Sequence, residues 1–143
     1  MVGRPPLVLP RAVHDEVVAH ARAALPNEGC GILAGRDGRV DRFYPAESSN
    51  PSPVFFTLEG AELMRIFTAI GEAYGLDDPE DAMLAIYHSH VSSPAFPSRS
   101  DVERAMWPDS AYLIVSLGVD PPEVKAYDIA EGRISRREVV VEP

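Results

Sequence analysis

The sequence of 143 residues has little of several things that would place it in common protein classes. Its single cysteine, Cys30, excludes a disulfide within the chain and any metal or redox motif of the Cys-x-x-Cys type. No apolar run approaches the roughly 18 to 20 residues that are needed to cross a bilayer. The first residues, MVGRPPLVLPRAVHDE, are interrupted by prolines and become charged too early for a signal peptide. We therefore expect a cytoplasmic protein with no membrane partner.

Basic residues are also few, since 13 lysines and arginines stand against 22 aspartates and glutamates, for a formal net charge of −9. Nucleic-acid binding draws most of its affinity from lysine and arginine that neutralise phosphates, so we expect no nucleic-acid partner. Hydrophobic residues make up 45% of the chain, enough for one core of ordinary size. We therefore expect a single domain over residues 1–143.

The spacing of apolar residues predicts a mixed α/β fold. Helical spacing predicts two long helices, over residues 11–25 and 59–74, and a short helix that begins near 98–101. Short apolar runs between turn residues predict strands at 7–9, 31–34, 40–44, 54–58, 83–87, 111–117, 124–129 and 134–141. The pairs Asp37-Gly38 and Glu131-Gly132 predict tight hairpin turns. We expect a mixed sheet that carries hairpins, with two long helices and one short helix packed on it.

Two of the four histidines stand one residue apart at the end of a predicted strand, in the stretch YHSHVSSPAFPSRSD. Side chains at i and i+2 of a strand point to the same face, so His88 and His90 can aim both imidazoles at one point while Ser89 faces away. The loop that follows can return Asp101 to the same neighbourhood at the start of the short helix. Two imidazoles and one carboxylate form a usual ligand set for catalytic zinc, with water in the fourth position.

Each part of this pattern also has a structural explanation. A His-x-His pair at a strand end is more often an incidental polar pair than a metal site, and Ser98 with Asp101 fits a capping box at a helix start. Glu28, in PNEGCGIL, is the best candidate for a catalytic base, but an acidic residue beside two glycines is more often solvated. The other histidines, His14 and His20, lie roughly 240° apart around the predicted helix and cannot share an ion. We interpret both as surface residues.

Taken together, these residues resemble the JAMM/MPN+ metalloprotease family. Glu28, then His88-Ser89-His90, seven residues, Ser98, two residues and Asp101 match the family pattern Glu … His-Ser/Thr-His-x7-Ser-x2-Asp. The surroundings EGCGIL and FPSRSD and the later strand YLIVSL agree as well. The resemblance spans about residues 7 to 141. It implies the MPN fold, a curved mixed sheet with helices against it.

The resemblance implies a role for each residue of the pattern. His88, His90 and Asp101 would bind one zinc ion (Zn2+) per chain. Glu28 would accept a proton from the attacking water and pass it to the leaving amine, and Ser98 would donate a hydrogen bond to the oxyanion of the tetrahedral intermediate. A two-histidine, one-carboxylate iron oxygenase would not need Glu28 or Ser98, and zinc deaminases need a pair of cysteines. A non-catalytic MPN binding module would lack ligands.

The sequence is similar to the small prokaryotic members and not to the eukaryotic members that cut polyubiquitin. The latter carry insertions around the active site, for which the connections at 48–58 and after Asp101 leave little room. The implied partner is a ubiquitin-like sulfur-carrier protein ending in Gly-Gly, from which cysteine or a short extension is released, a step of cysteine biosynthesis. The alternative is a deubiquitinase-like isopeptidase, and both a monomer and a homodimer stay open. We interpret Cys30 as a small buried residue, with a zinc-reaching switch as the weaker hypothesis.

Overall fold

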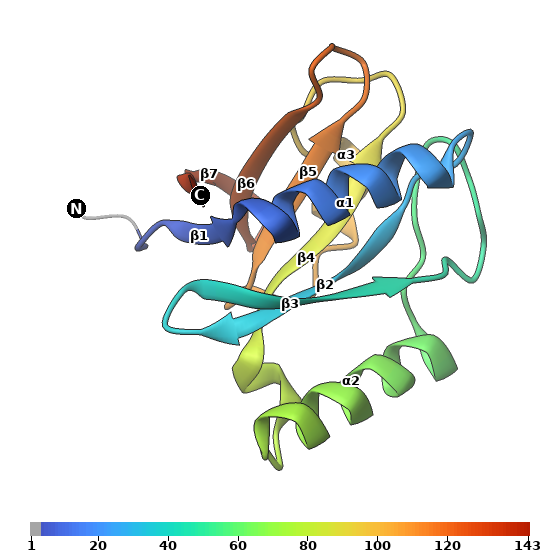
Figure 1. Ribbon diagram of the computed structural model, residues 1–143. Coiled ribbons are helices and arrows are strands. Elements are labelled where there is room, and N and C mark those ends of the chain that lie inside the picture. Colours follow the sequence, from blue (N-terminus) through green and yellow to red (C-terminus); the bar gives the residue numbers. More distant parts are fainter. Residues whose placement is uncertain (1–3) are drawn as a thin grey trace.

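The computed structural model describes residues 4–143 (Figure 1). Residues 1–3, part of the stretch that we expected not to be a signal peptide, lie outside the described residues. The strands of the described part are β1 Leu7–Pro10, β2 Cys30–Arg36, β3 Arg39–Ala46, β4 Met83–His90, β5 Ala111–Ser116, β6 Glu123–Ala130, β7 Arg133–Arg137 and β8 Val139–Glu142. Its helices are α1 Arg11–Ala24, α2 Gly60–Tyr74, the short 3-10 helix η1 Pro79–Ala82 and α3 Arg99–Glu103. Between residues 4 and 143, no helix is both long and apolar enough to cross a membrane.

The strands of the described chain form one mixed sheet in the order β7-β6-β5-β4-β2-β3-β1-β8. β4 pairs in parallel with β5, and β1 pairs in parallel with both β3 and β8, whereas the other pairs are antiparallel. β7 and β8 lie at opposite edges of the sheet, although only Glu138 separates them in the sequence. The sheet must therefore curl until its two edges approach each other, which confirms the curved mixed sheet that the resemblance implied.

The single strand predicted over residues 134–141 is wrong, because the chain bends at Glu138 and changes its partner there. β7 pairs with β6 at one edge, and β8 pairs with β1 at the other. The Glu138 carbonyl accepts a hydrogen bond from the N–H of Leu7 at 2.9 Å, which satisfies the backbone at the bend. An apolar run in a sequence does not show which strand each of its halves will contact.

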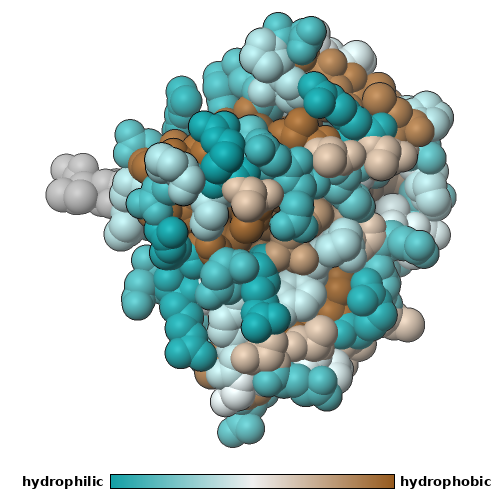
Figure 2. Space-filling model, in the orientation of Figure 1, coloured by the Kyte–Doolittle hydropathy of each residue, from teal (hydrophilic) through white to brown (hydrophobic). Residues whose placement is uncertain are grey.

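The sheet separates two apolar layers, with α1 packed on one face and α2 on the other (Figure 1). Alternate residues of β4 supply the two layers, since Ala85 and Tyr87 pack on the α1 side and Ile86 packs on the α2 side. The helices contribute buried side chains at helical spacing, namely Val13, Val17 and Ala21 from α1 and Ile66 and Ile70 from α2. Both predicted long helices are confirmed. On the face shown in Figure 2, hydrophilic side chains cover much of the surface, with apolar patches between them.

Both predicted tight turns are present. Asp37 and Gly38 join β2 to β3 with φ of 53° and 77°, and Glu131 and Gly132 join β6 to β7 with φ of 52° and 75°. Two successive positive φ values are typical of a type I′ turn, whose twist matches that of the flanking strands. The first hairpin places β2 beside β4, the strand that carries the two adjacent histidines.

Residues 48–59 form an irregular segment between β3 and α2, so the strand predicted over residues 54–58 is wrong. Both sides of β3 are already paired, with β2 and with β1, which leaves this segment no neighbouring strand edge. Thr57 ties the 48–59 segment down locally. Its N–H donates to Ser48 Oγ and its carbonyl accepts from the N–H of Ser49, both at 2.9 Å.

Candidate metal centre

The centre begins at the carboxyl end of β4, between β2 and β5. The alternation of the strand places His88 and His90 on the α2 side of the sheet and Ser89 on the α1 side. Ser89 Oγ accepts a hydrogen bond from the N–H of Gly29 at 2.8 Å, and its own N–H donates to the Gly29 carbonyl at 3.0 Å. β4 therefore presents both imidazoles to one side, as predicted, and with its other side fixes the backbone next to Glu28.

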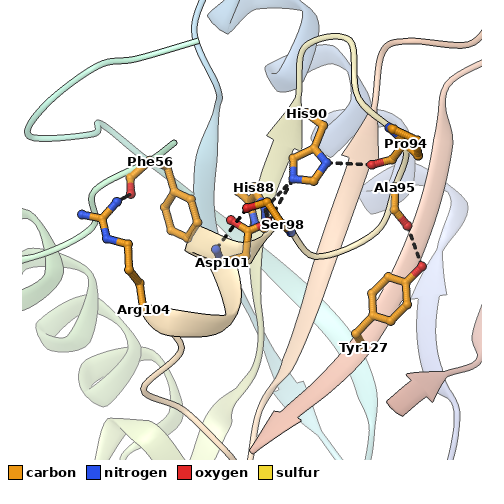
Figure 3. A network of polar contacts seen from close by, with 9 residues as sticks. All are labelled: Phe56, His88, His90, Pro94, Ala95, Ser98, Asp101, Arg104 and Tyr127. Atoms are coloured by element: carbon orange, nitrogen blue, oxygen red, sulfur yellow. Dashed lines mark hydrogen bonds and ion pairs between the residues drawn. The ribbon is translucent and has the colours of Figure 1, made fainter. Parts of the chain in front are cut away.

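Residues 91–98 carry the chain from β4 to α3 in a loop that the sheet anchors (Figure 3). The carbonyls of residues 93–95 each accept a side-chain hydrogen bond. The donors are Ser116 Oγ of β5, His90 Nδ1 and the hydroxyl of Tyr127 in β6, at 2.7, 2.7 and 2.5 Å respectively. The 91–98 loop therefore follows a fixed path to the start of α3.

At the start of α3, Ser98 and Asp101 form the capping box that the sequence predicted. Ser98 Oγ accepts a hydrogen bond from the N–H of Asp101 at 3.1 Å, and the N–H of Ser98 donates to Asp101 Oδ2 at 2.8 Å. The same Oδ2 atom also faces the two histidines. The structural and the metal-binding explanations of this pair are thus compatible, because the cap holds the carboxylate where an ion would need it.

Three ligand-type atoms meet in a nearly equilateral triangle. His88 Nε2 lies 3.2 Å from His90 Nε2, and each of these nitrogens lies 3.1 Å from Asp101 Oδ2. All three side chains are buried. Tetrahedral zinc binds such atoms at about 2.0 to 2.1 Å, which sets neighbouring ligand atoms about 3.3 Å apart. The triangle therefore fits zinc with little rearrangement.

The electrostatics of the three groups suit a cation. Burial opposes ionisation of Asp101, but hydrogen bonds from His88 and His90 hold its pKa well below the usual range, so it is an anion. Burial lowers the pKa of His88 below its ordinary value, which favours the neutral imidazole that binds metals. Burial also works against protonation of His90, but Asp101 and the Pro94 carbonyl raise the pKa of this group above its ordinary value. A bound metal ion would take the place of the proton on His90 that Asp101 attracts.

Glu28 lies in the turn between α1 and β2 and is only 6% exposed, so the solvated loop end that we weighed for it is wrong. Its N–H donates to the Ser52 carbonyl at 2.8 Å, whereas its Oε1 has no hydrogen-bond partner among residues 4–143. Burial raises the pKa of Glu28 to about 8, against a lowering influence of His90 and with a raising influence of Asp101. Glu28 is therefore near His90 and Asp101 without belonging to the triangle of candidate ligand atoms, and its carboxylate holds protons strongly.

His14 and His20, both predicted to be surface residues, are each partly buried, and the structure adds contacts with the sheet for His20. Its Nδ1 lies 3.1 Å from the Tyr87 hydroxyl, and its ring makes edge contacts with Phe43 and Tyr87. Burial lowers the pKa of His20. The spacing in the sequence could not show that β3 and β4 bring two aromatic rings against α1.

Cys30 is buried, as predicted, with 1% of its surface exposed. It is the register partner of His88 across β2 and β4, yet it does not join the three ligand atoms. Burial raises the pKa of its thiol to about 12, which keeps it protonated, whereas the thiolate is the form that binds metals. This geometry favours the small buried residue over the zinc-reaching switch.

A cavity of about 380 Å³ opens beside His88 and Asp101. Its walls are mostly aromatic or aliphatic and come from the 48–59 segment, α2, the residues just after α3, and the strands β4 and β5. They include Phe55, Phe56, Leu63, Met106, Trp107 and Tyr112. Sequence reasoning missed this cavity and two residues beside it, Phe56 and Arg104. The only signal was the pair of phenylalanines in a polar, proline-rich stretch, which we assigned to a strand.

The chain matches a known family over most of its length. The family model described as prokaryotic homologs of the JAB domain matches residues 10–130. The CysO-cysteine peptidase of Mycobacterium tuberculosis is 36% identical over 139 residues, which cover 94% of this chain and 90% of that protein. The probable TtuB-protein conjugate cleaving protease of Thermus thermophilus is 36% identical over 128 residues, which cover 89% of this chain and 78% of that protein.

Solved structures are similar as well. A protein from Desulfitobacterium hafniense has a TM-score of 0.78 and 33% identity, with 94% of this chain and 92% of that chain covered. A JAB1/MPN domain protein from Archaeoglobus fulgidus has a TM-score of 0.58 at 19% identity, with 92% and 97% covered, and this likeness shows the fold alone. The fold class that the sequence predicted is confirmed.

Proposed function

Because the chain belongs to the prokaryotic branch of the JAMM/MPN+ metalloprotease family, we propose that it is a zinc-dependent peptidase of ubiquitin-like sulfur-carrier proteins. The bond that it hydrolyses is the amide bond after the C-terminal Gly-Gly of the carrier. The product released is cysteine or a short C-terminal extension. The reaction is served by five residues: His88, His90 and Asp101 as metal ligands, and Glu28 and Ser98 as catalytic residues.

The observation that carries this proposal is the buried triangle of His88 Nε2, His90 Nε2 and Asp101 Oδ2, with sides of 3.1 to 3.2 Å. These three atoms would hold one zinc ion per chain and leave its fourth position free. When bound, zinc supplies a Lewis acid that lowers the pKa of water to about 7 and polarises a carbonyl. A non-catalytic binding module does not need this donor set.

Glu28 is the proton carrier of the proposed reaction. Its buried carboxylate has an oxygen without a hydrogen-bond partner in the described chain, and a cation held by the neighbouring ligands would favour its ionised form, so it could take a proton from the attacking water. It then gives this proton to the leaving amine. The two hydrogen bonds between Ser89 and Gly29 hold the adjacent backbone during both transfers.

Ser98 stabilises the oxyanion that forms when the carbonyl is attacked. Its Oγ accepts a hydrogen bond from the N–H of Asp101, which leaves its O–H free to donate. A single donor of this kind lowers the barrier by roughly 3 kcal/mol. The capping box fixes the hydroxyl before the substrate arrives.

The substrate class follows from the relatives and from the shape of the site. The similar protein of Mycobacterium tuberculosis is named a CysO-cysteine peptidase, and that of Thermus thermophilus a probable TtuB-protein conjugate cleaving protease. An extended diglycine has no side chains, so it can pass close to a buried metal without a clash. Specificity then comes from the folded body of the carrier and not from side chains at the bond.

A second candidate is an isopeptidase that removes a ubiquitin-like modifier from lysine side chains. The relative named for cleaving protein conjugates favours it. The two candidates share the acyl side of the bond, the carboxyl of the last glycine, and differ only in the amine that leaves.

Intact mass spectrometry separates these candidates. The purified enzyme is incubated with the host's Gly-Gly carriers that bear cysteine or native extensions and, in parallel, with a carrier joined to a lysine side chain. We expect the residues beyond the diglycine to be lost from the first set, and a chelator or Glu28→Gln to abolish the loss. Cleavage of the lysine conjugate alone would favour the isopeptidase, whereas intact carriers beside cleaved unrelated peptides would contradict both.

A further inference from the structure

The two histidines of the metal centre differ in what holds their second ring nitrogen. A metal-binding histidine usually donates this N–H to a carboxylate, a carbonyl or water, and the bond fixes the orientation of the ring. His90 follows this rule, because its Nδ1 donates to the Pro94 carbonyl at 2.7 Å. His88 does not, because its Nδ1 is buried and has no hydrogen-bond partner among residues 4–143. Something else must set the orientation of His88.

The ring of Phe56 lies against His88. The two ring centroids are 4.6 Å apart and the planes are inclined by only 19°, so the rings are stacked (Figure 3). A stacked neighbour resists tilting of the imidazole out of its plane, and such aromatic pairs contribute about 0.5 to 1.5 kcal/mol beyond the area that they bury. Phe56 can therefore restrict the motion that a hydrogen bond would otherwise restrict.

Phe56 belongs to the irregular 48–59 segment, so its ring is useful only if that segment is held. Arg104 holds it. One guanidinium nitrogen donates to the Phe56 carbonyl at 3.1 Å and the other to Thr57 Oγ1 at 3.3 Å, while the guanidinium carbon lies 5.3 Å from the centre of the Phe55 ring. Arginine suits this task because its planar fork of donors binds two acceptors at once and its face packs on an aromatic ring.

Arg104 also connects the two halves of the centre. It is the C-cap residue of α3, three positions after the ligand Asp101. α3 therefore places the Asp101 carboxylate at one corner of the ligand triangle. Through Arg104 and Phe56, it also supports the His88 imidazole at another corner. In Figure 3, Arg104 and Phe56 lie on one side of His88 and Asp101.

We propose that Phe56, clamped by Arg104, is the positioning residue of His88, and that its stacked ring takes the place of the hydrogen bond that His88 lacks. The inference rests on the proposed zinc site. It adds two residues outside the five-residue pattern, of which neither would touch the reacting atoms.

A simpler role for Phe56 is that of a cavity wall, because the ring also lines the 380 Å³ cavity beside the centre. The two roles predict different measurements. A wall that only contacts substrate changes KM and leaves zinc affinity unchanged. A positioning residue changes zinc affinity in the absence of any substrate.

The test measures zinc dissociation constants by competition with a chromophoric chelator, without substrate, in the parent protein and its variants. Phe56→Leu keeps an apolar side chain but removes the ring, and we expect zinc to bind about tenfold more weakly. Phe56→Tyr keeps the ring and should restore parental affinity. Arg104→Gln should weaken zinc less than Phe56→Leu, because the segment loses its clamp but keeps the ring. Phe96→Leu is the matched control, since Phe96 packs on Tyr127 and not on a ligand.

Cobalt(II) bound in place of zinc supplies a second readout, because its visible spectrum follows the geometry of the ligands. We expect the spectrum to change in Phe56→Leu and to stay parental in Phe96→Leu. Parental zinc affinity and a parental cobalt spectrum in Phe56→Leu would overturn the inference, even if KM rose. A parent protein that binds no zinc would overturn the proposed function as well, so the two failures are distinguishable.

Discussion

The two sides of the metal centre are built in different ways. On the His90 side, three side-chain hydrogen bonds tie the 91–98 loop to β4, β5 and β6. On the His88 side, the 48–59 segment has no place in the sheet, and it meets the imidazole with the face of an aromatic ring. The 91–98 loop on the His90 side is thus bonded to the sheet, whereas the 48–59 segment on the His88 side packs against the centre without pairing with a strand.

This difference predicts a division of labour. Buried hydrogen bonds between a loop and a sheet form with the fold, so losing one of them lowers the free energy of unfolding. A ring stacked on a ligand from an irregular segment contributes less to folding, but it limits the motion of the ligand. We expect changes on the His90 side to act mainly on stability, and changes on the His88 side to act mainly on metal affinity.

The largest expected effect is on catalysis and comes from Glu28, which belongs to neither side of the centre. Its substitution tests whether the two sides together support the proposed hydrolysis. In Glu28→Gln the amide cannot accept a proton, so kcat for carrier cleavage should fall by roughly 10²- to 10⁴-fold. Elemental analysis should find the zinc content of the parent, because Glu28 lies outside the ligand triangle. A variant as active as the parent would remove Glu28 from the mechanism.

Ser98 sharpens the comparison because, on the His90 side, one residue has both a proposed catalytic role and a role in folding, as the cap of α3. Ser98→Ala should lower kcat by about 10²-fold through the lost oxyanion donor. It should also lower the free energy of unfolding by about 1 kcal/mol through the lost helix cap. Ser98→Thr keeps the hydroxyl and should restore both quantities. Parental kcat together with lowered stability would leave Ser98 a cap and nothing more.

Tyr127 gives the most direct way to break the comparison. Tyr127→Phe removes the hydrogen bond to the Ala95 carbonyl and should cost about 1 kcal/mol in urea unfolding, with zinc affinity unchanged. Phe56→Leu, on the His88 side, should weaken zinc binding and leave the free energy of unfolding nearly unchanged. Equal losses of zinc affinity in the two variants would show that the sides do not differ.

The smallest effect concerns His20, on the face of the sheet away from the candidate metal centre. Burial lowers its pKa in the folded chain, so the unfolded chain takes up the proton first as the pH falls through about 6.5. Its contribution to stability is therefore complete above that pH and is lost below it. With chelator present, unfolding at neutral and at mildly acidic pH should show a smaller loss of stability in His20→Gln than in the parent. Identical losses would contradict this effect of burial.

The strand that carries the histidines could be predicted because its information is local. Alternation with a period of two fixes the faces of His88, Ser89 and His90, and the apolar run before them predicts the strand itself. The turns at Asp37-Gly38 and Glu131-Gly132 are local in the same sense, because their backbone requires residues that tolerate positive φ.

The features that the sequence did not predict depend on contacts between distant residues. The split of the last strand at Glu138 depends on β1, more than 100 positions earlier. The support of His88 joins Phe56, Arg104 and β4, and the burial of His20 depends on Tyr87. The spacing of residues in the sequence does not predict these contacts, because each depends on how the sheet curls and on which helix covers which face.

Zinc content measures most directly whether His88, His90 and Asp101 form the metal site on which the whole mechanism depends. Protein purified without added metal is analysed for zinc per chain, beside the double variant His88→Ala and His90→Ala and with circular dichroism as the control for folding. We predict a value near one for the parent and near zero for a folded double variant. A value that stays near one in the double variant, or a parent without zinc, would contradict the site.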